Sequence, residues 1–126
     1  MKWMTLWILC LSSAQVGAVA PDQTLLDACR SCHAMGQSDP EGIGPSLVGI
    51  VGRSAGTLPG YTYSSALAEA DFVWDIGTLR VWIKHSESMR PGTFMRYNNV
   101  LTPAEIDRLL NLLNPSDAKP NEQDHE

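Results

Sequence analysis

The sequence predicts an all-α fold, and two observations lead to that prediction. Several segments place apolar residues three and four positions apart, which is the spacing of one face of an α-helix. No segment shows the alternation of apolar and polar residues that indicates a half-buried strand, and no internal repeat is found. The 126 residues, of which 44% are hydrophobic and 18% charged, are enough for one small domain.

The clearest predicted helix follows Thr102. This threonine is a good N-cap, Pro103 suits the first helical position, and Glu105 completes a capping box. The helix then carries an apolar stripe with i, i+3, i+4, i+7 spacing, made of Ile106, Leu109, Leu110 and Leu113. Asn114-Pro115 should end it, because proline cannot continue a helix.

Two shorter helices are predicted nearer the N-terminus. The first spans about Asp22–Arg30, with Asp22 as its N-cap. The second lies within Tyr61–Ala70, where Ser64 and Ser65 are possible caps. With the helix after Thr102 and the helix described next, the residue pattern predicts four helices.

Asp75 should cap a further helix that ends before Pro91. Its apolar face is made of Ile76, Leu79, Trp82 and Ile83. The segment Ala34–Gly60 is different, because it holds seven of the ten glycines and three prolines and lacks helical periodicity. We expect it to be an ordered loop that wraps a functional group.

The run Cys29-Arg30-Ser31-Cys32-His33 has the Cys-x-x-Cys-His pattern of a c-type haem attachment site. Two thiols at this spacing can form thioethers to one porphyrin, and the adjacent histidine can bind its iron. A thioredoxin-like redox pair and half of a zinc site are the competing interpretations. The first needs a βαβ context, which is absent, and the second needs further ligands from Cys10, His85 and His125, which are badly placed.

Residues 1–20 are predicted to be a cleavable signal peptide. Lys2 supplies a positive start and Trp3–Leu11 form a mostly apolar run that is too short for a comfortable membrane span. Ala18-Val19-Ala20 offers a cleavage site after Ala20, with cleavage after Ala18 as the alternative because Pro21 hinders the peptidase. Export to the periplasm follows from this leader, and no stable membrane anchor is expected after cleavage.

The rest of the chain divides into one domain over residues 21–115 and a disordered acidic tail over residues 116–126. Loss of the leader would leave 8 basic and 14 acidic residues. Such a balance excludes a nucleic-acid partner and adhesion to anionic lipid, which both need a basic surface. The two remaining cysteines would both be used by the haem, so no disulfide is expected.

The sequence resembles class I cytochrome c, in its medium-length mitochondrial and bacterial branch, over about Leu25 to Leu113. Several motifs in the same order carry the resemblance: Cys29-x-x-Cys32-His33, Gly44-Pro45-x-Leu47-x-Gly49, Gly52-Arg53, Pro59-Gly60-Tyr61-x-Tyr63, Trp74, Thr78-Leu79 and Pro91-Gly92-Thr93-x-Met95. The resemblance implies an all-α cytochrome c fold, in which four to five short helices wrap one covalent haem and the first and last helices cross.

The resemblance also implies a role for each matching residue. His33 and Met95 would be the axial ligands, and the Pro45 carbonyl would accept the free ring N–H of His33. Met89 and Met35 are the other methionines considered, the first before the Pro-Gly turn and the second too close to the attachment site.

Four further residues match those that hydrogen-bond the haem propionates: Arg53, Tyr63, Trp74 and Thr93. An anion would also explain the arginine, because a buried unpaired guanidinium is costly. Three residues match the haem-packing positions: Leu47, Leu79 and Ile83.

Two departures from the family pattern concern the environment of the methionine. Many relatives have an Asn at the position of Leu67 and a Tyr at that of Trp82, whereas Leu67 cannot hydrogen-bond and Trp82 can only donate. The docking lysines of the mitochondrial branch are also missing. Arg90 and Arg96 remain there, and an apolar docking patch of Phe94, Tyr97 and Met89 is the expected replacement.

The function implied is that of a periplasmic electron-transfer protein, which cycles one haem iron between Fe(III) and Fe(II) and is not itself an enzyme. It would act as a monomer in transient complexes with redox partner proteins, whose identity the sequence does not give. Two alternatives remain: a dedicated electron-accepting subunit of a periplasmic dehydrogenase or oxidase, and a ligand-binding or peroxidase-like haem protein if Met95 is labile.

Overall fold

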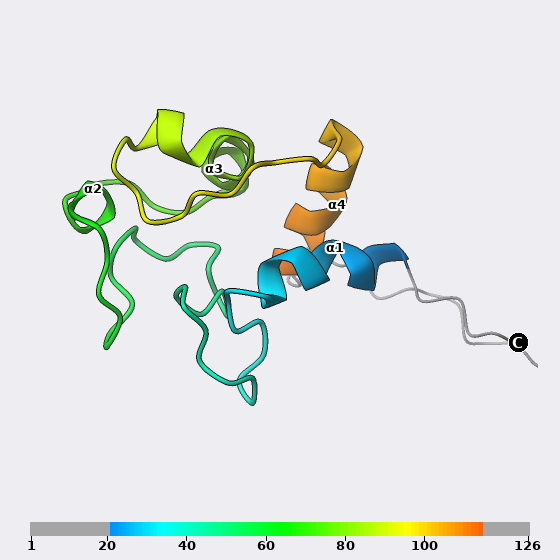
Figure 1. The fold of residues 1–126 in the computed structure, drawn as a ribbon, viewed down its shortest axis with the longest axis horizontal. Coiled ribbons are helices and arrows are strands. Elements are labelled where there is room, and N and C mark those ends of the chain that lie inside the picture. The colour runs from blue at the N-terminus through cyan, green and yellow to red at the C-terminus, as the bar shows by residue number, and fades with distance from the viewer. Residues whose placement is uncertain (1–20, 115–126) are drawn as a thin grey trace, which may run out of the picture.

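The computed structural model describes residues 21–114, so the predicted leader, the predicted tail, Cys10 and His125 lie outside the described residues. The described part contains four helices, α1 (Pro21–Arg30), α2 (Ser65–Ala68), α3 (Ile76–Met89) and α4 (Pro103–Leu113), and no strand (Figure 1). One isolated antiparallel bridge joins Ser54 and Val73. The all-α prediction is confirmed. No helix within 21–114 has the length and apolar character to span a membrane.

The first and last helices cross and pack against each other, as expected (Figure 1). Leu25 and Leu26 of α1 are buried, and Ile106, Leu109 and Leu110 of α4 are each only 1% exposed. Full burial of an aliphatic side chain stabilises a fold by roughly 1.5–3 kcal/mol, so this crossing is a main source of stability.

The structure corrects the start of the first helix. The helix begins at Pro21, so Asp22 lies in its first turn instead of capping it. Proline is favoured in the first turn because the N–H it lacks would have no partner there. The Asp22 carboxylate instead forms an ion pair with Arg108 of α4, with 3.7 Å between Oδ1 and Nη1.

The α4 prediction is confirmed in detail. The Thr102 side chain accepts a hydrogen bond from the backbone N–H of Glu105, and the Glu105 carboxylate accepts one from the backbone N–H of Thr102. The predicted apolar stripe of this helix is buried. Local capping and burial of one face therefore agree, which is the condition for a well-specified helix.

α3 begins as predicted, because the Asp75 carboxylate accepts hydrogen bonds from the Thr78 backbone N–H and hydroxyl at 2.6 and 2.8 Å. Leu79, Trp82 and Ile83 are buried, and the helix packs on α4. The sequence did not predict the break at His85, where φ is −149° and ψ is 53°.

The segment between α1 and α2 has no regular secondary structure, as predicted for an ordered loop. The helix predicted within Tyr61–Ala70 is confirmed as a single turn, Ser65–Ala68, with Ser64 at its N-cap position. Tyr61 donates a hydrogen bond to the Ile43 carbonyl at 3.0 Å, and its ring meets Tyr63 edge to face. These contacts fix the chain just before α2, whose N-cap residue Ser64 has extended dihedrals.

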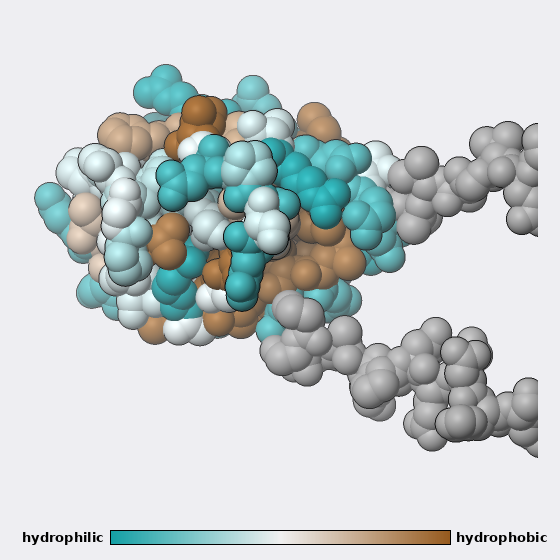
Figure 2. Space-filling model, turned by 90° about the horizontal axis from the view of Figure 1, so that it is seen from below, coloured by the Kyte–Doolittle hydropathy of each residue, from teal (hydrophilic) through white to brown (hydrophobic). Residues whose placement is uncertain are grey.

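The elements enclose the centre of the molecule from several sides. In Figure 1, α1 and α4 lie on one side, α2 and α3 lie on another, and the loop between α1 and α2 closes the lower edge. Figure 2 shows hydrophobic surface exposed between hydrophilic side chains on the face seen from below.

Candidate functional site

A cavity of about 520 Å³ lies between these elements, which is within the usual size range of sites for small molecules and cofactors. Its wall comes from the end of α1, the loop, α2 and the segment after it, α3, the segment after α3, and α4. Most of the lining side chains are apolar, and the buried ones include Leu67, Trp74, Leu79 and Trp82. Arg53 and Arg96 also line it, whereas no carboxylate of residues 21–114 does.

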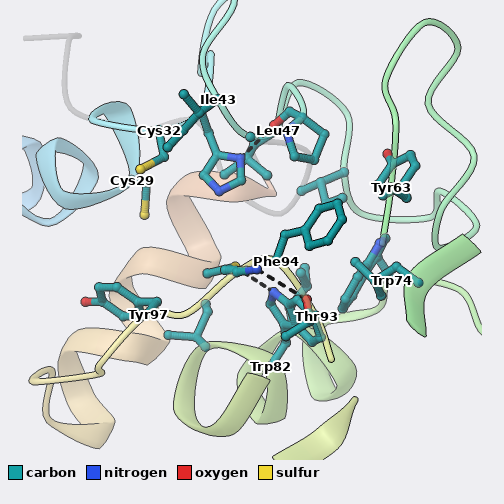
Figure 3. A pocket seen from close by; sticks show the side chains of 18 of the residues that line it. Cys29, Cys32, Ile43, Leu47, Tyr63, Trp74, Trp82, Thr93, Phe94 and Tyr97 are labelled. Atoms are coloured by element: carbon teal, nitrogen blue, oxygen red, sulfur yellow. Dashed lines mark hydrogen bonds between the residues drawn. The ribbon is translucent and has the colours of Figure 1, made fainter. Parts of the chain in front are cut away.

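Two free thiols stand on one wall of the cavity, at the end of α1 (Figure 3). The carbonyl of Cys29 accepts the backbone N–H groups of Cys32 and His33 at 3.1 and 2.9 Å, so the chain turns tightly and both sulfurs come from one short segment. Burial raises the pKa of the Cys29 thiol, and the neighbouring Cys32 raises it further. Cys29 is therefore a neutral thiol at pH 7 in this environment.

The ring of His33 also lines the cavity, and its Nδ1 lies 2.7 Å from the Pro45 carbonyl. A carbonyl only accepts hydrogen bonds, so Nδ1 carries a proton, and in the neutral ring Nε2 then has the lone pair. The backbone of Gly44 passes beside the ring: a Cβ atom there would lie 2.5 Å from Cε1 of His33. Together these contacts set the orientation of an imidazole that can bind a metal through Nε2.

Among the described methionines, Met95 is the one that lines the cavity. Met89 and Met35 do not line it, although all three pack against the hydrophobic core. The indole N–H of Trp82 donates to the Met95 sulfur at 2.9 Å (Figure 3). The Trp82 side chain can only donate a hydrogen bond, as the sequence indicated, and in the structure its acceptor is the Met95 sulfur.

Three of the four residues matched to propionate contacts have partners in the protein. The Arg53 guanidinium donates to the Ser46 carbonyl at 2.8 Å and more weakly to the Val48 carbonyl at 3.4 Å. Backbone carbonyl groups therefore satisfy part of this side chain. The Tyr63 oxygen accepts from the Leu58 N–H, so its own proton remains available.

Thr93 and Trp74 complete this group and also line the cavity. The Thr93 oxygen accepts the backbone N–H of Met95 at 3.3 Å, and its side chain is only 2% exposed. Trp74 is buried, and its ring meets Trp82 and Phe72 edge to face.

Ser64 is a site residue that the sequence suggested only as a helix cap. It occupies the N-cap position of α2, but its hydroxyl makes no capping bond. Its oxygen is buried, lines the cavity and has no hydrogen-bond partner among the described residues. A buried hydroxyl without a partner costs free energy, so this group calls for a polar atom inside the cavity.

The three residues of the expected apolar docking patch differ in exposure. Phe94 is 69% exposed, whereas Tyr97 and Met89 are half-buried and pack against the core. Ile43, which is 83% exposed and lines the same cavity, was missed because a lone apolar residue in a glycine-rich loop gives no signal of its position. The Arg90 guanidinium forms an ion pair with Asp71 and lies over the face of the Phe72 ring.

The donor set fits a haem group well. Its macrocycle is apolar and its two propionates are anionic, which matches an apolar wall that carries two guanidinium groups and an unpartnered buried hydroxyl. Two thiols, an oriented imidazole and a thioether complete the set. Within residues 21–114, no three His, Cys, Asp or Glu side chains gather into a site for a metal ion, so the cysteine pair does not belong to such a cluster.

Known proteins of one kind resemble the chain. Cytochrome c-550 of Bradyrhizobium diazoefficiens is 36% identical over 90 residues, which are 71% of this chain and 66% of that protein. Cytochrome c2 of Agrobacterium tumefaciens is 35% identical over 97 residues, which are 75% of this chain and 87% of that protein. No model of a protein family matches the chain.

A solved structure supports the same assignment. Cytochrome cH from Methylobacterium extorquens superimposes with a TM-score of 0.67 at 29% sequence identity, over 75% of this chain and 94% of that one. Similarity in sequence over most of the domain thus agrees with similarity in fold. The chain belongs to the class I cytochromes c, electron-transfer proteins that carry one covalent haem c.

Proposed function

We propose that this chain carries single electrons between redox partners in the periplasm, with one haem c joined to Cys29 and Cys32 and with His33 and Met95 as axial ligands. The observation that carries the proposal is that one cavity is lined by all four of these residues. When bound, the haem supplies an iron that takes up and releases one electron.

The role of the chain is to keep both ligands in place. The Pro45 carbonyl holds the His33 ring, and the Trp82 indole N–H holds the Met95 sulfur. Such outer contacts fix the orientation of a ligand and tune its basicity. Ligands fixed in this way move little when the oxidation state changes, which suits electron transfer.

We further propose that the polar groups of the cavity receive the propionates. The Ser64 hydroxyl lacks a partner, and the proton of Tyr63 is free to be donated. Arg53 adds a positive charge, and Trp74 and Thr93 line the same cavity. Donors around a carboxylate lower the cost of its burial, so these residues allow an anionic group to enter an apolar interior.

The mouth of the cavity is the proposed docking face. Phe94 and Ile43 line the cavity and are 69% and 83% exposed, with Arg96 beside them. This combination of apolar surface and little charge fits a redox protein with an apolar docking face, and it does not fit an acidic one.

Electron self-exchange between two copies of the matured protein provides a probe of this face. Phe94→Ala should lower the self-exchange rate measured by NMR line broadening. Val100→Ala is the matched control, because Val100 is 85% exposed and does not line the cavity. Equal rates in the two variants would place the docking face elsewhere.

The proposal also holds that the protein is not an enzyme and acts in the periplasm. The predicted leader and the bacterial origin of the similar proteins support export. Support for a carrier instead of a peroxidase-like protein comes from the Trp82–Met95 contact, because a methionine held in place and bound to the iron would block peroxide from that position.

The test compares Met95→Ala with Met89→Ala in protein matured with haem. By voltammetry, wild type and Met89→Ala should give one reversible one-electron wave, without catalytic current when peroxide is added. Met95→Ala should lose the high-potential wave and bind carbon monoxide rapidly when reduced. If Met89→Ala behaves in this way and Met95→Ala does not, the ligand assignment is wrong.

A further inference from the structure

A second contact from α3 reaches Met95, at its backbone. Ser86 follows the break at His85 and is only 4% exposed. Its hydroxyl donates to the Met95 carbonyl at 2.9 Å. Trp82 lies before this break and Ser86 after it, and both side chains contact Met95.

The segment between α3 and α4 has little regular structure of its own. Two of its hydrogen bonds are long. The backbone N–H of Met95 donates to the Thr93 side-chain oxygen at 3.3 Å, and the backbone N–H of Gly92 donates to the Glu87 carboxylate, also at 3.3 Å. The Ser86 contact is shorter than either. It therefore ties the backbone of this segment directly to a helix of the core.

We propose that Ser86 is a positioning residue that keeps Met95 on the iron. Trp82 holds the sulfur and Ser86 holds the carbonyl, so α3 fixes both ends of the residue. The inference rests on the proposed ligation by Met95. It adds a role for a hydroxyl that does not touch the haem site, since Ser86 does not line the cavity.

The role has a measurable consequence. An added ligand such as imidazole binds the ferric iron only in molecules whose Met95 has moved away. Its apparent affinity is therefore proportional to the fraction of such open molecules. Removal of the hydroxyl leaves the Met95 carbonyl without this donor, and one net hydrogen bond corresponds to a change of about fivefold in that fraction.

The experiment titrates the ferric, haem-containing protein with imidazole and follows the visible spectrum. Ser86→Ala should bind imidazole about fivefold more tightly than wild type. Ser88→Ala should not differ from wild type, and it makes the same change at an exposed position of the same helix. Both variants share the small gain in helix propensity from alanine, so the comparison isolates the hydroxyl.

A second pair of variants separates the hydroxyl from packing. Ser86→Thr and Ser86→Val add side chains of nearly equal shape, and only the first keeps a hydroxyl. The valine variant should bind imidazole more tightly than the threonine variant, even if both are less stable than wild type. This comparison decides the question if Ser86→Ala does not fold.

Two results would overturn the role of Ser86: equal affinities for Ser86→Ala and Ser88→Ala, or equal affinities for the threonine and valine variants. Failure of the proposed function would look different. In that case wild-type ferric protein would lack a methionine–iron band before any imidazole is added, and no variant would change the affinity.

Discussion

The imidazole of His33 occupies the space in which a side chain of residue 44 would lie. A Cβ on Gly44 would come within 2.5 Å of Cε1 and 2.7 Å of Nδ1 of His33. Real Cβ atoms do not approach other atoms so closely, so the ring or the backbone would have to move. Glycine at this position therefore belongs to the geometry of the proposed iron ligand.

Gly44→Ala should destabilise the haem-containing protein by about 1–3 kcal/mol, the usual cost of overpacking. The shift of the His33 ring should also weaken its hydrogen bond to Pro45. Denaturant unfolding measures the first effect. Gly36→Ala is the control, because its Cβ would meet only the Asp39 side chain, at 3.4 Å or more. Equal stability of the two variants would contradict this account.

At the scale of residues, motifs with fixed spacing were the most informative part of the sequence. The residues that these motifs singled out, Cys29, Cys32, His33 and Met95, all line one cavity in the structure. Ser64 and Ser86 were not assigned to the site, because a serine carries no sequence pattern that reports burial. Only the fold shows that one hydroxyl lacks a partner and that the other meets a carbonyl.

At the scale of elements, α3 and α4 are fixed by their caps. The Thr78 backbone N–H and hydroxyl donate to Asp75, and these bonds lower the pKa of its carboxyl below the ordinary 3.8. A carboxyl with a lowered pKa in the folded state stabilises the fold above its ordinary pKa. This stabilisation is lost as the pH falls through the folded-state pKa.

Asp75→Asn should remove this pH dependence while keeping the cap, because asparagine is also a good N-cap. The denaturation midpoints of wild type and variant, measured from pH 6 to pH 3, should converge at the acid end. Asp39 and Glu105 also have lowered pKa values. Both residues are present in wild type and variant, so their effects on stability cancel when the two midpoints are subtracted. A difference that stays constant over this range would contradict the role of Asp75.

Helices with caps and apolar stripes were predictable, and the candidate caps Ser64 and Ser65 marked the start of α2. The break at His85 was not predictable, because it coincides with no proline or glycine and no local signal marks it. The contact between Tyr61 and Ile43 was not predictable either, because the two residues are far apart in the sequence.

At the scale of the whole molecule, the cavity lies inside the hydrophobic core. Its lining includes Ile83 of α3 together with Leu109 and Leu113 of α4. A group that fills this space binds the folded chain and not the unfolded chain, so it adds to the stability of the fold. Fold and cofactor should therefore be strongly coupled.

The chain prepared without haem should consequently show much less helix than the matured protein in far-ultraviolet circular dichroism. It should also unfold without a sharp thermal transition, because the apolar lining is then open to water. The same chain matured with haem is the control. A haem-free chain with the full helical signal and a cooperative transition would show that the protein alone supplies the core.

The central claim is that the chain supplies both axial ligands and keeps them in both oxidation states. The visible and near-infrared spectrum of the haem-containing wild-type protein tests it most directly. We predict a ferric charge-transfer band from methionine–iron bonding, and no spectral change when carbon monoxide is added to the reduced protein. A missing band together with rapid carbon monoxide binding would contradict the claim and favour a ligand-binding haem protein.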